Sequence, residues 1–417
     1  MNMKSFLAIA GAAILTLSTP SFAKTQSSPI VMGYWTNWGP YWTIRPYSIA
    51  NNPDFDAQLN QLNVLAYAFM EVDQNGSVQF SDTWSDLSAA DANFCSQHAA
   101  ICLNQIPTQG LGNFHAFSDI HQRHPAIKLV FSIGGAGHDA SFQNAFQHPD
   151  TFVQSVVALV KAYNLDGVDL DFEPAQWDAT TADQYLALVQ KLRLALPQSF
   201  ITAAVSANPT LISAFDGTTH RWQTLLKSID VIGVMAYDLH GGYDGVGQKT
   251  AFHSNLYSDS KDPYATHYSA DAAVQAYLAT GVPADQIILG VPAYGRIEAG
   301  VAAGDTHGLY QPFTSTVRNG DLGDEMESYY TIASHWLGNG FTDYWYSVDN
   351  RLSGIFAYNT QTALFVSFDN VAMIDAKVAY VKTHQLRGMM MWELRADLSP
   401  KDPNNASLLK HMHDGLL

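Results

Sequence analysis

Three carboxylates alternate with apolar residues in the segment Leu165–Glu173, and their types and spacing are suited to proton transfer. The acids are Asp169, Asp171 and Glu173, and the apolar residues are Val168, Leu170 and Phe172. Successive side chains of a β-strand point to opposite faces, so the three acids would share one face. Ionised carboxylates so close together in a partly desolvated interior repel one another, which raises at least one pKa. We therefore predict acid–base chemistry here, with Glu173 at the end of the strand as the proton donor.

Other uses of these acids have less support. A calcium loop needs Gly and polar spacing, whereas the residues between the acids are apolar. The chain has neither a CxxC pair nor an HExxH sequence, so a zinc site has no support. The run Gly135–Ala140 fits a loose dinucleotide pattern, but no suitable acid follows about 20 residues later. We expect neither a metal nor a cofactor.

Eight short apolar runs are predicted to be strands, and amphipathic helical patterns separate several of them. The strands are Ile30–Trp35, Leu62–Phe69, Leu129–Ile133, Gly167–Phe172, Ile201–Ser206, Val231–Ala236, Ile287–Val291 and Gly388–Trp392. The helical patterns include Asp150–Tyr163, Thr181–Leu196 and Ser269–Thr280. Strands that alternate with helices pair in parallel, so we predict the α/β class and a (β/α)8 TIM barrel, with a doubly wound open sheet as the competing topology. Barrel active sites lie at the carboxyl ends of the strands, where Glu173 falls.

Two connections, Glu71–Ile127 and Ile297–Arg387, are too long for simple strand–helix links. The second contains strand-like pieces at Gly354–Tyr358 and Leu364–Phe368. We predict that residues 297–387 form a small α+β insertion between strands seven and eight. No repeat or linker marks a second independent domain, so residues 24–417 are assigned to one catalytic barrel that includes this insertion.

Four acids at fixed spacing also carry a family resemblance. Asp166-Gly-Val-Asp169-Leu-Asp171-Phe-Glu173 is similar to the DxxDxDxE signature of glycoside hydrolase family 18, the chitinase family. Other segments resemble barrel strands of that family in the same order, namely Gly33-Tyr34-Trp35, Ser132-Ile133-Gly134-Gly135, Met235-Ala236-Tyr237-Asp238 and Met391-Trp392. The resemblance covers nearly all of residues 24–417, and the insertion resembles the one found in chitinases with deeper clefts.

This resemblance implies roles for the matching residues. Glu173 would protonate the glycosidic oxygen, the substrate's own 2-acetamido oxygen would attack the anomeric carbon to give an oxazolinium ion, and Glu173 would then act as base for water. Asp171 would accept a hydrogen bond from the acetamido N–H and share a proton with Asp169. Tyr34 and Ser132 match positions that hydrogen-bond Asp169.

The resemblance also implies a set of substrate contacts. Tyr237 matches a phenol that donates to the acetamido oxygen, and Trp392 matches an indole that stacks on the sugar; a core tryptophan is the alternative. Met235 and Asp238 match substrate contacts, although Met235 could equally pack in the core. Asp166 lies off the acidic face and is expected to be structural.

Further contacts are expected around the cleft. Arg296, in a segment similar to a family YGR, is expected to hydrogen-bond sugar hydroxyls. Three tryptophans after the first strand could line further subsites or pack in the core: Trp35, Trp38 and Trp42. The run Gly135-Ala136-Gly137-His138 lacks the Trp that many chitinases have there, so we expect one aromatic wall of the donor side to be missing.

Composition limits the partners. The chain has 417 residues, 38 acidic against 21 basic side chains and a net charge of -17, which argues against binding to nucleic acid. Only 14% of residues are charged and 12% are aromatic, which suits a neutral ligand with flat apolar faces. The resemblance specifies that ligand as chitin or N-acetylglucosamine oligosaccharides. We expect a monomer without a membrane partner.

The first 23 residues predict export. Lys4 precedes the apolar stretch Phe6–Leu17, and small residues at Ser21 and Ala23 fit a signal-peptidase site. The stretch is shorter than the roughly 20 residues that span a bilayer. In an oxidising compartment Cys95 and Cys102 could form a disulfide or remain two free thiols.

Together these observations predict a secreted, endo-acting chitinase that cleaves β-1,4 bonds with retention. An endo-β-N-acetylglucosaminidase acting on glycans or peptidoglycan would use the same acids. A chitin-binding lectin on the same barrel is the third possibility, but such members typically lack one of the acids that are present here.

Overall fold

The computed structural model describes residues 28–42, 45, 49, 52–88, 112–264, 268–317 and 320–417. The predicted signal peptide and both cysteines, Cys95 and Cys102, lie outside these ranges.

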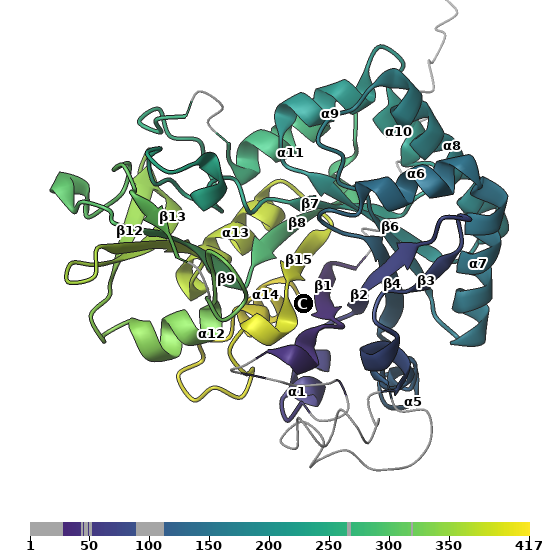
Figure 1. Ribbon diagram of the computed structural model, residues 1–417, viewed down its shortest axis with the longest axis horizontal. Coiled ribbons are helices and arrows are strands. Elements are labelled where there is room, and N and C mark those ends of the chain that lie inside the picture. The colour runs from purple at the N-terminus through teal and green to yellow at the C-terminus, as the bar shows by residue number, and fades with distance from the viewer. Residues whose placement is uncertain are drawn as a thin grey trace, which may run out of the picture.

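Eight parallel strands of the described chain close into a barrel (Figure 1). They are β1 (Ile30–Thr36), β2 (Val64–Val72), β4 (Lys128–Gly134), β5 (Gly167–Asp171), β6 (Phe200–Ser206), β7 (Val231–Met235), β8 (Ile287–Pro292) and β15 (Gly388–Trp392). Each strand pairs with its neighbours in this order, and β1 closes the ring by pairing with both β2 and β15. A short strand, β3 (Val78–Phe80), runs antiparallel to β2. The predicted TIM barrel is therefore confirmed.

Helices cover the outside of the barrel. The longer ones are α7 (Pro149–Ala162), α8 (Ala179–Ala195), α11 (Ala270–Ala279) and α13 (Val371–Thr383). The others are α1 (Phe55–Leu59), α4 (Asn113–Ser118), α5 (Ile120–Arg123), α6 (Asp139–Gln147), α9 (Pro209–Asp216), α10 (Arg221–Leu225) and α14 (Leu408–Leu416). The short α12 (Tyr329–Thr331) belongs instead to the insertion that precedes β15. Helix α8 begins where the side chain of Asp178 accepts a hydrogen bond from the backbone N–H of Thr181, the usual way to satisfy a free donor at a helix start.

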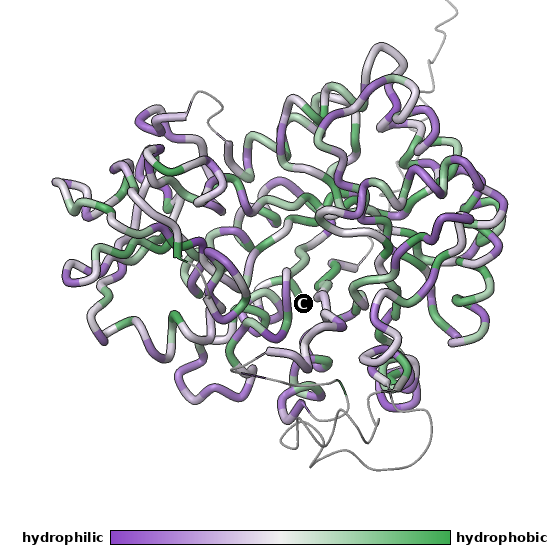
Figure 2. Tube along the Cα trace, in the orientation of Figure 1, coloured by the Kyte–Doolittle hydropathy of each residue, from purple (hydrophilic) through white to green (hydrophobic). Residues whose placement is uncertain are grey.

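Side-chain alternation divides the strands into an inner and an outer face. Val168 and Leu170 of β5 belong to the large apolar cluster between strands and helices. Met32 of β1 and Met390 of β15 belong to a separate cluster within the barrel. Figure 2 shows the hydrophobic stretches along the central strands. The acids of β5 alternate with its outward apolar residues, so they lie on the inner face.

An antiparallel sheet of six strands is inserted between β8 and β15 and lies beside the barrel (Figure 1). Within the described residues its strands are β9 (Tyr294–Ala299), β10 (Ser315–Thr316), β11 (Met326–Ser328), β12 (Thr342–Val348), β13 (Arg351–Asn359) and β14 (Leu364–Phe368). The predicted piece Gly354–Tyr358 falls within β13, and Leu364–Phe368 coincides with β14. The sheet spans 294–368, and α13 then leads the chain back to β15.

Two buried contacts join the inserted sheet to the barrel. Ala293 is the single residue between β8 and β9, and its N–H donates to the carbonyl of Trp392 at 2.8 Å. The ammonium of Lys377, on α13, donates to Asp369 Oδ2 at 2.5 Å and to Ser254 Oγ at 2.6 Å. Lys377 and Asp369 are 0% and 2% exposed, so this ion pair is shielded from solvent.

No helix in the described ranges is long and apolar enough to cross a bilayer.

Candidate active site

Asp169 is the innermost acid of β5, and three hydroxyls hold it. Its Oδ2 accepts hydrogen bonds from Tyr34 at 2.9 Å and Ser132 at 2.7 Å, and its Oδ1 accepts one from Thr202 at 2.5 Å. Ser132 on β4 and Thr202 on β6 lie directly opposite Asp169 in the strand register. Burial raises the pKa of Asp169, while the hydroxyls of Thr202, Ser132 and Tyr34 oppose that rise.

Asp171 and Glu173 extend the row towards the open end of the barrel. Asp171 is 5% exposed, and its Oδ1 has no hydrogen-bond partner among the described residues. Burial, followed by the charges of Glu173 and Asp169, holds the pKa of Asp171 well above its ordinary value. Burial and the charges of Asp238 and Asp139 raise the pKa of Glu173 to about 7. Glu173 can therefore carry a transferable proton near neutral pH.

Two glycines place the end of β4 against these acids. Gly134 and Gly135 have φ of 108° and 90°, values that side chains other than glycine rarely adopt. The N–H of Gly135 donates to the carbonyl of Asp171 at 2.9 Å. A Cβ on Gly135 would lie 2.5 Å from the ring of Phe69, so only glycine allows this close approach.

Asp238 follows β7 and is held by residues of the inserted sheet. Its Oδ1 accepts hydrogen bonds from Tyr294 Oη at 2.7 Å and Arg296 Nε at 2.8 Å, and its Oδ2 accepts one from Arg296 Nη2 at 2.6 Å. Burial disfavours the charged form of Asp238, but Arg296 and His253 together lower its pKa below the ordinary value. Arg296, predicted to bind sugar hydroxyls, thus directs Nε and Nη2 to Asp238.

Aromatic rings pack beside the acids around Trp392. The indole stacks on Phe69 with a centroid distance of 5.4 Å, and it contacts Tyr34 at 5.3 Å and Trp38 at 6.2 Å. Trp392 remains partly exposed at the end of β15. Phe69, on β2, was not among the predicted site residues, because its place beside Trp392 arises only when the barrel closes.

The other two candidate tryptophans lie elsewhere. Trp35 is fully buried and packs edge-on against Phe55 at 4.9 Å, which makes it a core residue. Trp42 lies against the guanidinium of Arg395, 4.1 Å from the ring centroid. Of the three, only Trp38 lies beside Trp392.

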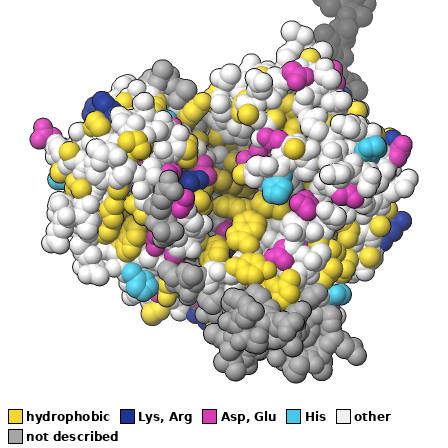
Figure 3. All heavy atoms as spheres, viewed as in Figure 1, with side chains coloured by type: hydrophobic (Ala, Val, Ile, Leu, Met, Phe, Trp, Pro, Cys, Tyr) yellow, Lys and Arg dark blue, Asp and Glu magenta, His cyan; other side chains and the backbone are white. Residues whose placement is uncertain are grey.

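A cavity of about 380 Å³ opens beside Glu173. Its lining includes Glu173, Met235, Tyr237 and Asp238, but not Trp392. Beyond these residues it is lined largely by aromatic and apolar side chains, among them Trp177, Leu211, Tyr243 and Tyr268. Figure 3 shows hydrophobic side chains gathered in the hollow at the centre of one face, with acidic side chains around them.

Two predicted residues have contacts that bear on their roles. Tyr237 lies in this lining, its hydroxyl is 4.0 Å from the sulfur of Met390, and burial holds its pKa well above the ordinary value, so it remains a neutral donor. Asp166 lies outside the lining, where its Oδ2 accepts hydrogen bonds from the N–H of Leu129 at 2.7 Å and contacts the ring of His121 at 2.9 Å. Asp166 thus ties β5 to β4.

In the described ranges no three His, Cys, Asp or Glu side chains are grouped so that they could hold a metal ion.

A parallel barrel with a row of carboxylates and stacked aromatic rings at its open end has the features of a glycoside hydrolase. The comparison with family models specifies which kind. Residues 30–397 match the model described as "Glycosyl hydrolases family 18", and the chain belongs to that family.

Curated proteins and solved structures agree with this assignment. The chain is 30% identical over 401 residues to Chitinase 1 of Aphanocladium album, covering 92% of this chain and 84% of that protein. It is 28% identical to Endochitinase 1 of Metarhizium robertsii, covering 94% and 88%. Among solved structures, Chitinase ChiA74 from Bacillus thuringiensis matches with a TM-score of 0.75 at 25% identity, covering 94% of this chain and 70% of that one.

Proposed function

We propose that this glycoside hydrolase is a secreted, endo-acting chitinase that cleaves β-1,4 bonds between N-acetylglucosamine units with retention. One observation carries the proposal: Asp171 keeps a buried carboxylate oxygen without a hydrogen-bond partner among the described residues, next to a Glu173 whose pKa is about 7. A buried acceptor of this kind is costly unless a donor arrives with the ligand. The N–H of a 2-acetamido group is such a donor.

In this mechanism the substrate supplies its own nucleophile. Glu173 donates its proton to the glycosidic oxygen as the bond to the anomeric carbon breaks, and the acetamido carbonyl oxygen bonds to that carbon to form an oxazolinium ion. Asp171 accepts the acetamido N–H and stabilises the positive charge, and Tyr237 donates to the acetamido oxygen. Water then attacks the anomeric carbon, gives its proton to Glu173 and restores the acetamido group with overall retention.

The surroundings of the acids give each a separate task. The three hydroxyls on Asp169 favour its ionised form against burial, so Asp169 raises the pKa of Asp171 and favours a shared proton between the two acids. Arg296 keeps Asp238 ionised, and the charge on Asp238 in turn helps Glu173 to stay protonated. Trp392, beside Tyr34 and Phe69, offers an indole face on which a sugar can stack.

The decisive experiment compares wild type with Glu173→Gln on chitin oligosaccharides, using the anomeric proton signals of fresh product to determine the stereochemistry. We expect β-anomeric product from wild type and at least a 100-fold lower rate from the variant, since it lacks the acid and base. Unchanged turnover in Glu173→Gln would contradict the catalytic assignment. An inactive wild type that binds chitin oligosaccharides with micromolar affinity would instead indicate a lectin.

Two further measurements address the finer points. Faster release of an N-linked glycan than of chitin fragments would replace the chitinase proposal by an endo-β-N-acetylglucosaminidase. Cleavage of internal bonds in a hexasaccharide, seen as trimers and tetramers early in the reaction, is expected from an endo-acting enzyme. Export is tested by sequencing the amino terminus of the protein from the culture medium, where we expect the chain to start at Lys24.

A further inference from the structure

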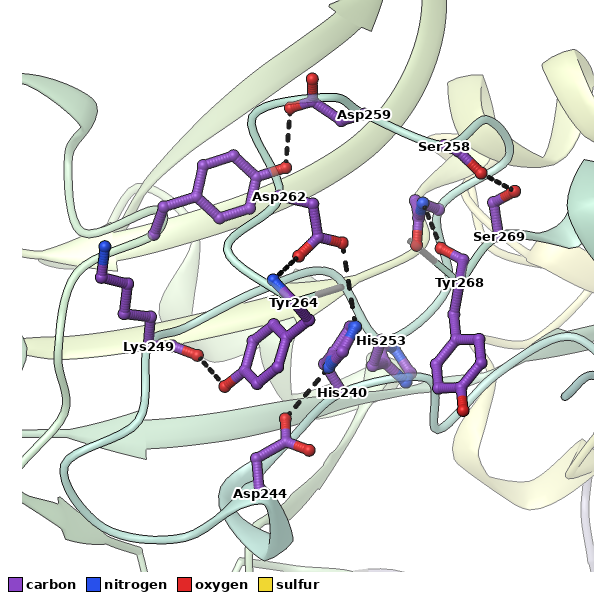
Figure 4. Close-up of polar contacts among 12 residues, drawn as sticks. His240, Asp244, Lys249, His253, Ser258, Asp259, Asp262, Tyr264, Tyr268 and Ser269 are labelled. Carbon is purple, nitrogen blue, oxygen red and sulfur yellow. Dashed lines mark hydrogen bonds and ion pairs between the residues drawn. The ribbon is translucent and has the colours of Figure 1, made fainter. Parts of the chain in front are cut away.

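His240, in the segment that follows β7, lies between two carboxylates from different parts of the chain (Figure 4). Its Nδ1 is 3.1 Å from Asp244 Oδ2, and its Nε2 is 3.8 Å from Asp262 Oδ2. The side chain is only 3% exposed, and its ring stacks on that of Tyr264 with a centroid distance of 4.2 Å. His240 is absent from the site predicted from the sequence, and it has no part in the chemical steps above.

The two segments that meet at His240 both contribute to the cavity wall. Tyr243 and Asp244 come from the short turn after His240, and Tyr268 comes from the chain beyond Asp262; all three line the cavity, whereas His240 does not. The hydroxyl of Tyr264 donates to the carbonyl of Lys249 at 2.6 Å. The ring of His240 therefore joins one part of the wall to a segment that is itself anchored.

The other contacts of Asp244 and Asp262 show which part of the wall depends on His240. Asp244 Oδ2 also accepts the N–H of Gly241 at 3.2 Å, which closes the turn on itself. Asp262 Oδ1 accepts the N–H of Tyr264 at 2.8 Å, while its Oδ2 is directed to His240. The imidazole thus links the turn that carries Tyr243 to the segment that carries Asp262.

The two nitrogens of His240 make different contacts. Nδ1 lies within hydrogen-bonding distance of Asp244 Oδ2, whereas the 3.8 Å between Nε2 and Asp262 Oδ2 is the distance of an ion pair and too long for a hydrogen bond. The groups that face the ring are Asp244 on its own segment and Asp262, Tyr264 and Tyr268 on the opposite one. The stacked ring and these contacts hold the turn against the segment that carries Asp262 and Tyr264.

We propose that His240 is a positioning residue that holds the Tyr243–Asp244 wall of the cavity and so sets how tightly the substrate units in the cavity are bound. This inference rests on the proposed function only in that the bound units are sugars.

The first test does not use activity. Hydrogen–deuterium exchange of the segment 239–248 is measured in wild type and in two variants at the same pH. In His240→Gln we expect several-fold faster exchange than in wild type, and His148→Gln, an exposed histidine outside the cavity lining, should match wild type. Equal exchange in wild type and His240→Gln would overturn the proposal.

A second variant keeps the test decisive if His240→Gln does not fold. Asp262→Asn removes one carboxylate and leaves the histidine in place. The amide weakens the contact with His240 Nε2, so we expect faster exchange in 239–248 than in wild type. Exchange as slow as that of wild type would show that Asp262 has no part in the link and would overturn the proposal.

The second test separates binding in the cavity from the chemical step. For a chitin hexasaccharide, His240→Gln should raise KM about five- to tenfold, the loss expected for one hydrogen bond, with a smaller change in kcat. An unchanged KM, or a loss carried by kcat alone, would overturn the proposal. If wild type does not cleave the hexasaccharide, the proposed function fails, and the exchange measurement still decides the role of His240.

Discussion

Arg296 and Asp238 face each other through two parallel hydrogen bonds, Nε to Oδ1 at 2.8 Å and Nη2 to Oδ2 at 2.6 Å. This geometry keeps a negative charge close to Glu173, although burial alone would favour the neutral acid. Bidentate pairs of this kind combine charge with fixed orientation. An arginine of the inserted sheet therefore influences the acid of the barrel through an aspartate that lies between them.

Asp238→Asn should move the alkaline limb of the pH–rate profile to lower pH. Glu173 must be protonated to act as acid, so the rate falls as pH rises through its pKa of about 7. Removing the charge of Asp238 lowers that pKa, and we expect a shift on the order of one pH unit in kcat/KM. Asp349→Asn, an exposed change on the β12–β13 turn, is the control and should leave the profile in place. An unmoved limb in Asp238→Asn would refute the coupling.

Glu173→Gln should stabilise the protein above pH 7. The folded-state pKa of Glu173 is raised, so folded protein binds more protons than unfolded protein between its ordinary value and about 7, and stability falls as pH rises through that window. The amide removes this loss, and we expect a Tm gain of roughly 1–3 °C at pH 8 that disappears near pH 4.5. Calorimetry over this range would check it. Glu71→Gln, at the surface beside Gln79, should show no such trend.

Trp392→Ala should lower activity but not stability, and Trp35→Ala should lower stability. Trp392 is partly exposed beside the acids, so its loss should lower kcat/KM on chitin oligosaccharides by roughly 10- to 100-fold while Tm changes little. Trp35 is fully buried, and its removal should cost about 3–5 kcal/mol of stability by leaving a cavity. Parallel kinetic and thermal measurements distinguish the two. A large drop in Tm for Trp392→Ala would mark it as a core residue instead.

Lys377→Met should be strongly destabilising, because it leaves the carboxylate of Asp369 buried without its cation. The expected loss is roughly 3–5 kcal/mol in urea unfolding. The double variant Lys377→Met, Asp369→Asn removes the orphaned charge and should recover part of that loss. If the double variant were as unstable as the single one, packing rather than charge would explain the effect.

The strands of the barrel could be predicted closely because central parallel strands are nearly continuous apolar runs. For example, β5 is Gly167–Asp171, one residue shorter than the predicted strand Gly167–Phe172. In the inserted sheet β12 could not be recognised, because its residues are polar or aromatic and only partly buried.

The parts of the site missed by sequence reasoning depend on contacts between distant segments. Thr202 lies in an otherwise ordinary apolar strand, and only the register of β5 against β6 brings its hydroxyl to Asp169. In the sequence, the only indication of this role was a single threonine within the apolar run Ile201–Ser206. His240 likewise lies next to the recognised MxYD segment, but Asp262, its second acidic neighbour, is 22 positions away in sequence.

Ala293 restricts the movement of the inserted sheet relative to the barrel. One residue separates the barrel strand β8 from the inserted strand β9, and its N–H is itself bound to the carbonyl of Trp392. A hinge motion needs a few backbone torsions that are free to rotate, and this single linking residue does not supply them. We therefore expect the width of the groove to be the same with and without a saccharide, so that a polymer enters by sliding into a rigid channel rather than by being clamped.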